Sequence, residues 1–313
     1  MKFSKKGLIF CPKGEHKFMN SHAQVPTILE GEKHFRVYFS TRPNPKLSLT
    51  TFLDIDKNNP KKVIYLHDKS IIPCGGPGTF DEFGVMPSTV VRKEGVVYMF
   101  YTGWSRGETV PYLNAVGLAV SEDNGKTFEK HSKGPIIERR EHEPFSAMSP
   151  YVLYEHGTWH MWYSSGTGWY KSKVKYEPIY LIKYAKSTDG IHWNQTNIIS
   201  INPKNELEAM TRPSVVKIAD KYHMWFCYRD SLDYRGGRGS YRIGYADSDD
   251  MINWRRKDSK AGITVSKKGW DSVMVQYPQI IKLKNKLLMF YNGNGFGASG
   301  IGYAVGEMNK IKL

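Results

Sequence analysis

The feature that most constrains the fold is a segment that recurs five times along the chain. Each copy places a proline before two or three apolar residues, a short turn and an aromatic-rich run, as in MPSTVVRKEGVVYMFYTG and RPSVVKIADKYHMWFCY. Successive copies begin 61, 63, 63 and 65 residues apart, at Pro26, Pro87, Pro150, Pro213 and Pro278. Self-similarity at a near-constant period is the signature of a repeat architecture, so the repeat is the first guide to the fold.

Each copy continues in the same way after its aromatic run. A third apolar run ends in Ala-x-Ser or a relative of it, a turn containing Asp follows, and Phe128, Trp193 or Trp254 then begins another strand. Asp and Gly favour such tight turns, so Asp123, Asp189 and Asp249 are predicted to hold them. Four short strands per copy, five copies and no convincing amphipathic helix predict an all-β fold, a five-bladed β-propeller.

The two ends of the chain complete this prediction. The fifth copy stops after its third strand, and residues 6–12 (KGLIFCP) resemble an isolated fourth strand. Pairing that N-terminal strand with the last blade would close the ring and leave no long exposed edge. We therefore expect one domain over residues 1–313. Its blades are predicted at about 26–73, 87–137, 150–200, 213–265 and 278–306, the last completed by 6–12.

The charge balance restricts the expected partners. The chain carries 45 Lys and Arg residues against 30 Asp and Glu residues, a formal net charge of +15. Such a surplus raises the affinity for phosphates and other anions, unless it merely solvates the surface. No basic run interleaved with aromatic residues appears, so no nucleic-acid partner is expected. A sugar or sugar-nucleotide ligand suits the charge better.

Composition also excludes several classes of protein. Hydrophobic residues make up 40% of the chain, a globular balance, and no apolar run approaches the ~20 residues of a membrane span. The N-terminal apolar stretch is four residues long, shorter than a signal peptide requires, so a cytoplasmic protein is expected. Three cysteines without CxxC spacing predict neither a disulfide framework nor a zinc site. No metal and no cofactor are expected.

Candidate functional residues come from the loops that enter each first strand and those that join the second strand to the third. In a propeller these loops share one face, around a central funnel, and here they combine carboxylates, arginines, amides and aromatic residues. Such a set suits a sugar site, unless the acids only hold loop backbones or pair with arginine. The predicted catalytic acids are Asp81, Glu82, Glu143, Glu208 and Asp271. The predicted substrate-binding residues are His22, Gln24, Arg42, Trp104, Trp169, Arg212, Arg229, Asp230, Gln276, Tyr277 and Asn294.

Several of these segments carry a family resemblance. GTFDEFGVMPS (78–88), WDSVMVQYP (270–278) and the Asp-Gly-x-x-Trp hairpins resemble the five-bladed propeller superfamily of glycoside hydrolase families 32, 43, 62, 68 and 130. The whole chain also resembles propeller proteins that accompany bacterial O-antigen and capsule genes. That likeness is carried by SHAQVP (21–26), YFSTR (38–42), YTGW (101–104) and YRIGYADS (241–248). The resemblance implies the propeller fold and a carbohydrate-related function.

The chain departs from these families at their catalytic positions. Families 43 and 62 place a carboxylate immediately before the first-blade proline, where this chain has Val25, and the Asn-Asp-Pro nucleophile of family 32 is absent. The residues before the other four prolines are Met86, Ser149, Arg212 and Tyr277. The acid trio of these families therefore carries over to no position, and acids for catalysis would have to come from further upstream.

Two functions follow. The first is a glycosidase-like enzyme that acts on a glycosidic or glycosyl-phosphate bond in bacterial surface-polysaccharide metabolism, with funnel carboxylates as acid and base. The alternative is a non-catalytic propeller that binds a sugar or sugar nucleotide and has lost the usual acids. Two carboxyl groups about 5–9.5 Å apart and facing open space would favour catalysis, whereas carboxylates occupied by arginines would favour binding.

Overall fold

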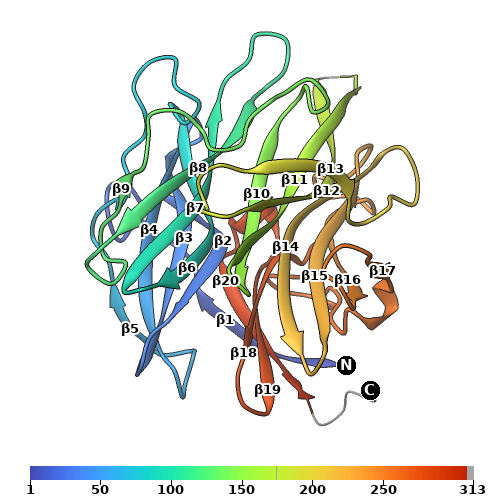
Figure 1. Cartoon of the computed structure of the whole chain (residues 1–313). Coiled ribbons are helices and arrows are strands. Elements are labelled where there is room, and N and C mark those ends of the chain that lie inside the picture. Colours follow the sequence, from blue (N-terminus) through green and yellow to red (C-terminus); the bar gives the residue numbers. More distant parts are fainter. Residues whose placement is uncertain (174, 309–313) are drawn as a thin grey trace.

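The computed structural model describes residues 1–173 and 175–308. The predicted all-β fold is confirmed: the described elements are twenty strands and two short 3-10 segments, η1 (Asp258–Lys260) and η2 (Gly295–Gly297). Figure 1 shows the strands grouped in sheets that follow one another along the sequence. In this part of the chain, no helix reaches the length and apolar character needed to cross a membrane.

The first two repeats share one eight-stranded sheet. Its strands are β2 (Ser21–Glu30), β3 (His34–Asn44), β4 (Leu47–Asp56), β5 (Val63–Leu66), β6 (Gly84–Lys93), β7 (Val96–Ser105), β8 (Leu113–Ser121) and β9 (Glu129–Lys130). Within each repeat neighbouring strands are antiparallel, and a single parallel pairing of Ser48 with Gly84 links β4 to β6.

The other three repeats form separate four-stranded sheets. The third contains β10 (Ala147–Glu155), β11 (Thr158–Lys171), β12 (Tyr176–Ser187) and β13 (Asn194–Ile199); the fourth contains β14 (Glu208–Ile218), β15 (Lys221–Asp230), β16 (Arg242–Ser248) and β17 (Arg255–Arg256). The last contains β18 (Gln276–Lys282), β19 (Lys286–Asn292), β20 (Ile301–Glu307) and the N-terminal β1 (Phe3–Phe10). Strand β1 pairs antiparallel with β20, so the N-terminal segment lies beside the last repeat as predicted.

The first strands of the repeats are neighbours in space. Strand β2 contacts β6, β6 contacts β10, β10 contacts β14, β14 contacts β18, and β18 contacts β2. Packing between sheets buries the aromatic runs: Val37, Met99, Met161, Met224 and Met289 are at most 1% exposed. These positions are core, as expected for strands that pack face to face across apolar layers. The number of blades and the closure of the ring remain predictions.

The outer strand of the first repeat and the apolar pair that follows it have different roles. The outer strand is β5, which begins eight residues before Ile71, and Ile72 forms only an isolated bridge with Thr50. Ile71 and Ile72 are buried, whereas Ile64 of β5 is 49% exposed. The apolar pair is therefore used to fill the core, and the ladder is extended by a more exposed segment.

The carboxylates of two hairpins hold their turns as predicted. Asp123 and Asp189 each accept two backbone N–H groups from residues later in the same turn. In the fourth repeat Asp250 has this role, and the prediction for Asp249 is wrong by one residue. The turn requires an acid two positions after a serine, and the serine there is Ser248; Asp249 forms an ion pair with Arg255.

Because its turn stabilises the charged form of Asp123, we expect the protein to lose stability in acid. Burial tends to raise the pKa of Asp123, but hydrogen bonds from Thr127, Ser121 and Lys126 outweigh it and lower the pKa to about 2. An Asp in an unfolded chain titrates near pH 3.9, so the stabilisation is complete above that pH and is lost as the pH falls toward 2. Urea unfolding at pH 4 and pH 2 should show this loss, and Asp123→Asn should lose less. An equal loss in both proteins would contradict the assignment.

Candidate functional site

The candidate site is a cavity of about 390 Å³, called the funnel below, to which all five repeats contribute. Its lining is aromatic and apolar with a few cations. The aromatic members are Trp104, Tyr112, Tyr180, Tyr234, Tyr241, Tyr277 and Phe296; the cations are Arg42, Lys175 and Arg235. No carboxylate is among the described residues that line it. A concave site with aromatic walls and a few placed polar groups is typical of small-molecule binding.

A bulge before each of four prolines shapes the floor of the funnel. Val25, Ser149, Arg212 and Tyr277 have φ of 54°, 51°, 54° and 54°, and the ladder shifts register at each position. Proline has no N–H for the ladder, so the strand bulges at this point and the side chain before the proline is turned to another direction. Val25, Ser149 and Tyr277 line the funnel.

The strain at Val25 is held by a tertiary contact. A β-branched residue at positive φ is unfavourable, and here the Val25 N–H donates to Asn292 Oδ1 at 2.8 Å. Asn292 is fully buried and also donates to the carbonyls of Ala23 and Gly300. Outliers of this kind concentrate at binding and catalytic sites, where the surrounding structure fixes them.

The five predicted catalytic acids do not line the funnel. Asp81 is 1% exposed, forms an ion pair with Lys130 at 2.6 Å and accepts the phenol of Tyr101 at 2.9 Å. Asp271 repeats this arrangement in the last sheet, with Lys5 at 2.6 Å and Tyr291 at 3.0 Å. In each case the acid before the first strand of a repeat links the second strand of that repeat to its outermost strand.

The other acids are also occupied. Both carboxylate oxygens of the buried Glu208 accept from Arg256 at 2.7 Å. Glu143 is buried and accepts the phenol of Tyr163 and the Ser165 hydroxyl, the latter at 2.6 Å. Glu82 is half-buried and accepts the backbone N–H of Gly78 at 3.0 Å.

The buried phenols remain hydrogen-bond donors to these acids. Burial and the Asp81 carboxylate raise the pKa of Tyr101, and the same causes raise those of Tyr163 beside Glu143 and Tyr291 beside Asp271. A protonated phenol donates to a carboxylate, so each pair is stable across the physiological pH range. These acids hold the sheets together.

The predicted substrate-binding residues divide into two groups. Gln24, Arg42, Trp104 and Tyr277 line the funnel, and the others do not. Those outside it are His22, Trp169, Arg212, Arg229, Asp230, Gln276 and Asn294.

The residues outside the funnel mostly have partners within the protein. The Gln276 amide donates to the Gly293 carbonyl, Asn294 accepts the N–H of Val273, and Asp230 accepts the N–H of Leu232. Trp169 packs edge-on against Tyr112 with ring centroids 5.9 Å apart, which places it behind a residue of the funnel wall.

Sequence reasoning missed much of the funnel wall. Tyr112, Lys175, Tyr180, Tyr234 and Tyr241 line the funnel and were not among the predicted site residues. Tyr180 lies on β12, Lys175 lies in the loop between β11 and β12, and Tyr112 packs against Trp169 of β11. The paired register of these two strands extends to Lys171 and Tyr176. The aromatic run of the third repeat is unusually long, and this was the sequence signal that could have indicated the long hairpin.

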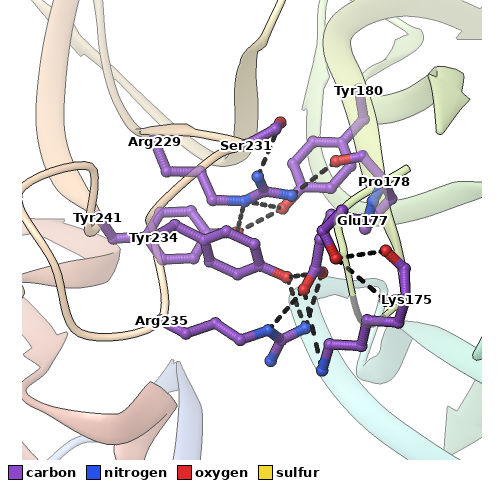
Figure 2. A network of polar contacts seen from close by, with 10 residues as sticks. Lys175, Glu177, Pro178, Tyr180, Arg229, Ser231, Tyr234, Arg235 and Tyr241 are labelled. Atoms are coloured by element: carbon purple, nitrogen blue, oxygen red, sulfur yellow. Dashed lines mark hydrogen bonds and ion pairs between the residues drawn. The ribbon is translucent and has the colours of Figure 1, made fainter. Parts of the chain in front are cut away.

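A polar network supports this wall (Figure 2). Glu177 accepts two hydrogen bonds from Arg235 at 2.8 Å and one from the phenol of Tyr234 at 2.5 Å, and Lys175 lies 3.8 Å away. Burial tends to raise the pKa of Glu177, but Arg235 and Tyr234 outweigh it and lower the pKa. The carboxylate thus stays charged and offsets one of the two positive charges at the funnel mouth.

Arg229 is the second centre of the network (Figure 2). It is 2% exposed and donates to the phenols of Tyr180 and Tyr241, to the Ser231 hydroxyl and to the Pro178 carbonyl. Its guanidinium lies 3.7 Å from the ring centroid of Tyr234, a cation–π contact. Arg229 therefore holds the aromatic residues of the wall in place and is not itself among the residues that line the funnel.

The described residues contain no group of three or more His, Cys, Asp or Glu side chains that could hold a metal ion. What the funnel offers is stacking on aromatic faces, amide and hydroxyl hydrogen bonds, and positive charge. Aromatic faces and directed polar groups are the means by which proteins bind sugar rings.

Comparison with known proteins finds a matching family model and two close relatives in sequence. The sequence profile of the glycosyl hydrolases family 32 N-terminal domain matches residues 76–211. "Uncharacterized protein MT1551" of Mycobacterium tuberculosis is 37% identical over 310 residues, which covers 98% of this chain and 100% of the relative. "Uncharacterized protein Rv1502", from a second strain of that species, matches equally.

Solved structures share the fold. A BT0996 complex with RGII superposes with a TM-score of 0.73 at 17% identity, covering 97% of this protein and 91% of its counterpart. A member of the GH130 family, described as containing glycoside hydrolases that target beta-1,2 mannosidic linkages in Candida mannan, superposes with a TM-score of 0.71 at 14% identity, covering 98% and 94%. The chain belongs to the family of these mycobacterial proteins, and it shares its fold with the solved structures.

Proposed function

We propose that the funnel binds a saccharide and that this chain is a glycosidase-like propeller that works by binding, without a two-carboxylate hydrolytic site. One observation carries the proposal: the funnel is lined by seven aromatic residues, and no carboxylate is among its described lining residues. Hydrolysis of a glycosidic bond ordinarily requires two carboxyl groups that flank the bond about 5–9.5 Å apart. The acids that sequence predicted for this task are held in buried contacts elsewhere.

A glycosidase-like enzyme is the second candidate, because the Glu177 carboxylate contacts a residue that lines the funnel. Glu177 accepts the phenol of Tyr234, a funnel residue, at 2.5 Å. To act as acid or base, Glu177 would have to be released from Arg235. Glu177→Gln should abolish turnover on the enzymatic hypothesis. On the binding hypothesis it leaves two cations at the mouth without a countercharge and strengthens the binding of anions.

The architecture and setting are part of the proposal. We propose five blades over residues 1–313, with the ring closed by β1; the cyclic contacts of β2, β6, β10, β14 and β18 support it. We also propose a cytoplasmic role in bacterial surface-polysaccharide metabolism, which rests on the resemblance to proteins of O-antigen and capsule loci. Fractionation of cells and polysaccharide analysis of a deletion strain would test this setting.

A thermal-shift screen tests the binding function directly. Sugar nucleotides, their bare nucleotides and neutral oligosaccharides would be compared on the purified chain. A ligand at ~100 times its Kd should stabilise the protein by about 2.7 kcal/mol, which is roughly 4 °C for a chain of this length. Tyr112→Ala should weaken the shift because it removes an aromatic face of the funnel.

Tyr65→Ala is the matched control for that variant, because Tyr65 is 45% exposed on the outer strand β5. It should leave the shift unchanged. Absence of a shift with every saccharide would contradict the binding function, and release of a cleaved sugar by the wild-type protein would favour the enzyme.

A further inference from the structure

We infer that Arg42 recognises an anionic group on the ligand, so that the saccharide bound in the funnel carries a carboxylate, phosphate or sulfate. The inference rests on the proposed function, because it names the class of saccharide that the same funnel takes. Three cations line the funnel, and they differ in whether a countercharge is present.

Two of the three cations share one countercharge within the protein. Arg235 and Lys175 are exposed at the mouth, and the Glu177 carboxylate lies 2.8 Å from Arg235 and 3.8 Å from Lys175. This carboxylate offsets one of their two positive charges.

Arg42 has no such partner. It is half-buried on β3, and its one hydrogen bond is to the amide oxygen of Gln24 at 3.2 Å. Its Nε is buried and has no hydrogen-bond partner, and among residues 1–173 and 175–308 no carboxylate forms an ion pair with it. A buried donor without an acceptor is costly, and a guanidinium presents a planar fork that fits the paired oxygens of a carboxylate or phosphate.

The groups around Arg42 leave its charge unopposed. Burial and Arg42 itself lower the pKa of His22 to about 4, so His22 is neutral above that pH. Tyr277, which does line the funnel, is also near enough to affect the guanidinium, and burial raises its pKa, so its phenol is neutral as well. The recognition of an anion by Arg42 should therefore not depend on titration of these two neighbours between pH 5 and pH 8.

A second unpartnered atom in the funnel fits the hydroxyl groups of a sugar. Asn114 lines the funnel, and its Oδ1 is buried without a hydrogen-bond partner while its amide nitrogen donates to the Gly103 carbonyl. The funnel thus holds a cationic donor from the first repeat and a neutral acceptor from the second, both unsatisfied. A ring that bears an anionic group and a free hydroxyl offers a partner to each of these two lining side chains.

The test is a set of matched neutral and acidic probes on the full chain. Glucose would be compared with glucuronate and glucose 1-phosphate, galactose with galacturonate, and N-acetylglucosamine with its 1-phosphate and 6-sulfate. Affinities would be measured by calorimetry on the wild-type protein, Arg42→Gln, Arg42→Lys and Arg92→Gln. Arg92 is the control for loss of one positive charge, because it is exposed and donates to Asn124 in a hairpin turn.

We expect at least one acidic probe to bind the wild-type protein about tenfold or more tightly than its neutral partner. Arg42→Gln should bring the two affinities close together, Arg42→Lys should retain part of the preference, and Arg92→Gln should retain all of it. The acid that binds best identifies whether the group is a carboxylate, a phosphate or a sulfate. Asn114→Ala should weaken both members of a pair by the same factor.

The outcomes separate this inference from the proposed function. If neutral and acidic partners bind alike, or if Arg42→Gln keeps the preference for the acid, the role of Arg42 is overturned and the saccharide-binding function stands. If no probe and no longer oligosaccharide binds, the proposed function fails and the inference fails with it. Thermal melting of each variant shows whether a loss of binding reflects a loss of folding, and Arg42→Lys serves if Arg42→Gln does not fold.

Discussion

Replacing Arg212 by methionine is expected to lower the free energy of unfolding by about 3 kcal/mol or more. Arg212 is 1% exposed on the innermost strand β14 and reaches across to two other repeats. It donates to the Ser88 carbonyl and, at 2.8 Å each, to the Pro26 carbonyl and the Thr27 hydroxyl. Methionine fills a similar space but leaves these buried acceptors without a donor.

The arrangement gives Arg212 a structural role in place of the substrate-binding role that its sequence position suggested. Burial lowers its pKa to about 10, so the guanidinium is charged at neutral pH and draws its stabilisation from neutral oxygens. Thermal melting should show a decrease of roughly 5 °C, given the unfolding entropy of a chain of this length. Arg139→Met, at an exposed position, is the control and should melt like the wild-type protein. A decrease below about 1 °C would contradict the cross-repeat role.

Asp81→Asn is expected to lower the free energy of unfolding by about 3 kcal/mol, because it leaves the Lys130 ammonium partly buried without its countercharge. The catalytic hypothesis makes the opposite prediction, since a variant of a catalytic acid should fold normally and lose only activity. Chemical denaturation measures the difference directly.

The adjacent acid supplies a matched control. Glu82 is half-buried and accepts the N–H of Gly78 within its own loop, so Glu82→Gln should cost less than about 1 kcal/mol. Combining Asp81→Asn with Lys130→Met removes both members of the pair and should restore part of the lost stability. Equal effects of Asp81→Asn and Glu82→Gln would show that the ion pair contributes little.

Much of the fold was predictable because it depends on local patterns that recur. The five prolines and the aromatic runs repeat with the period of one sheet, and alternation of side chains across a strand sends the same positions into the core each time. The pairing of β1 with β20 was predictable as well, because only the last repeat lacks its outer strand. The hairpin acids were found to within one residue, since their turns obey a Ser-x-Asp spacing.

The site was less predictable because two facts about it are not local. Lys5 pairs with Asp271 across 266 positions of the sequence, and Arg256 pairs with Glu208 across 48, so sequence order does not show that these acids are occupied. Bulges decide toward which face of the strand the residues before the prolines point. A shift of one residue in the register moves a side chain to the opposite face of the strand.

The sequence by itself therefore determined the repeat and the all-β class, and it indicated loops that contribute residues to the funnel. Only the tertiary structure decided which residues face the funnel: it placed the acids between strands and left Arg42 in an aromatic cavity with a neutral amide as its side-chain partner. The physical reason is that secondary structure follows from short-range periodicity, whereas the charge and exposure of a side chain depend on partners that the chain brings from distant repeats.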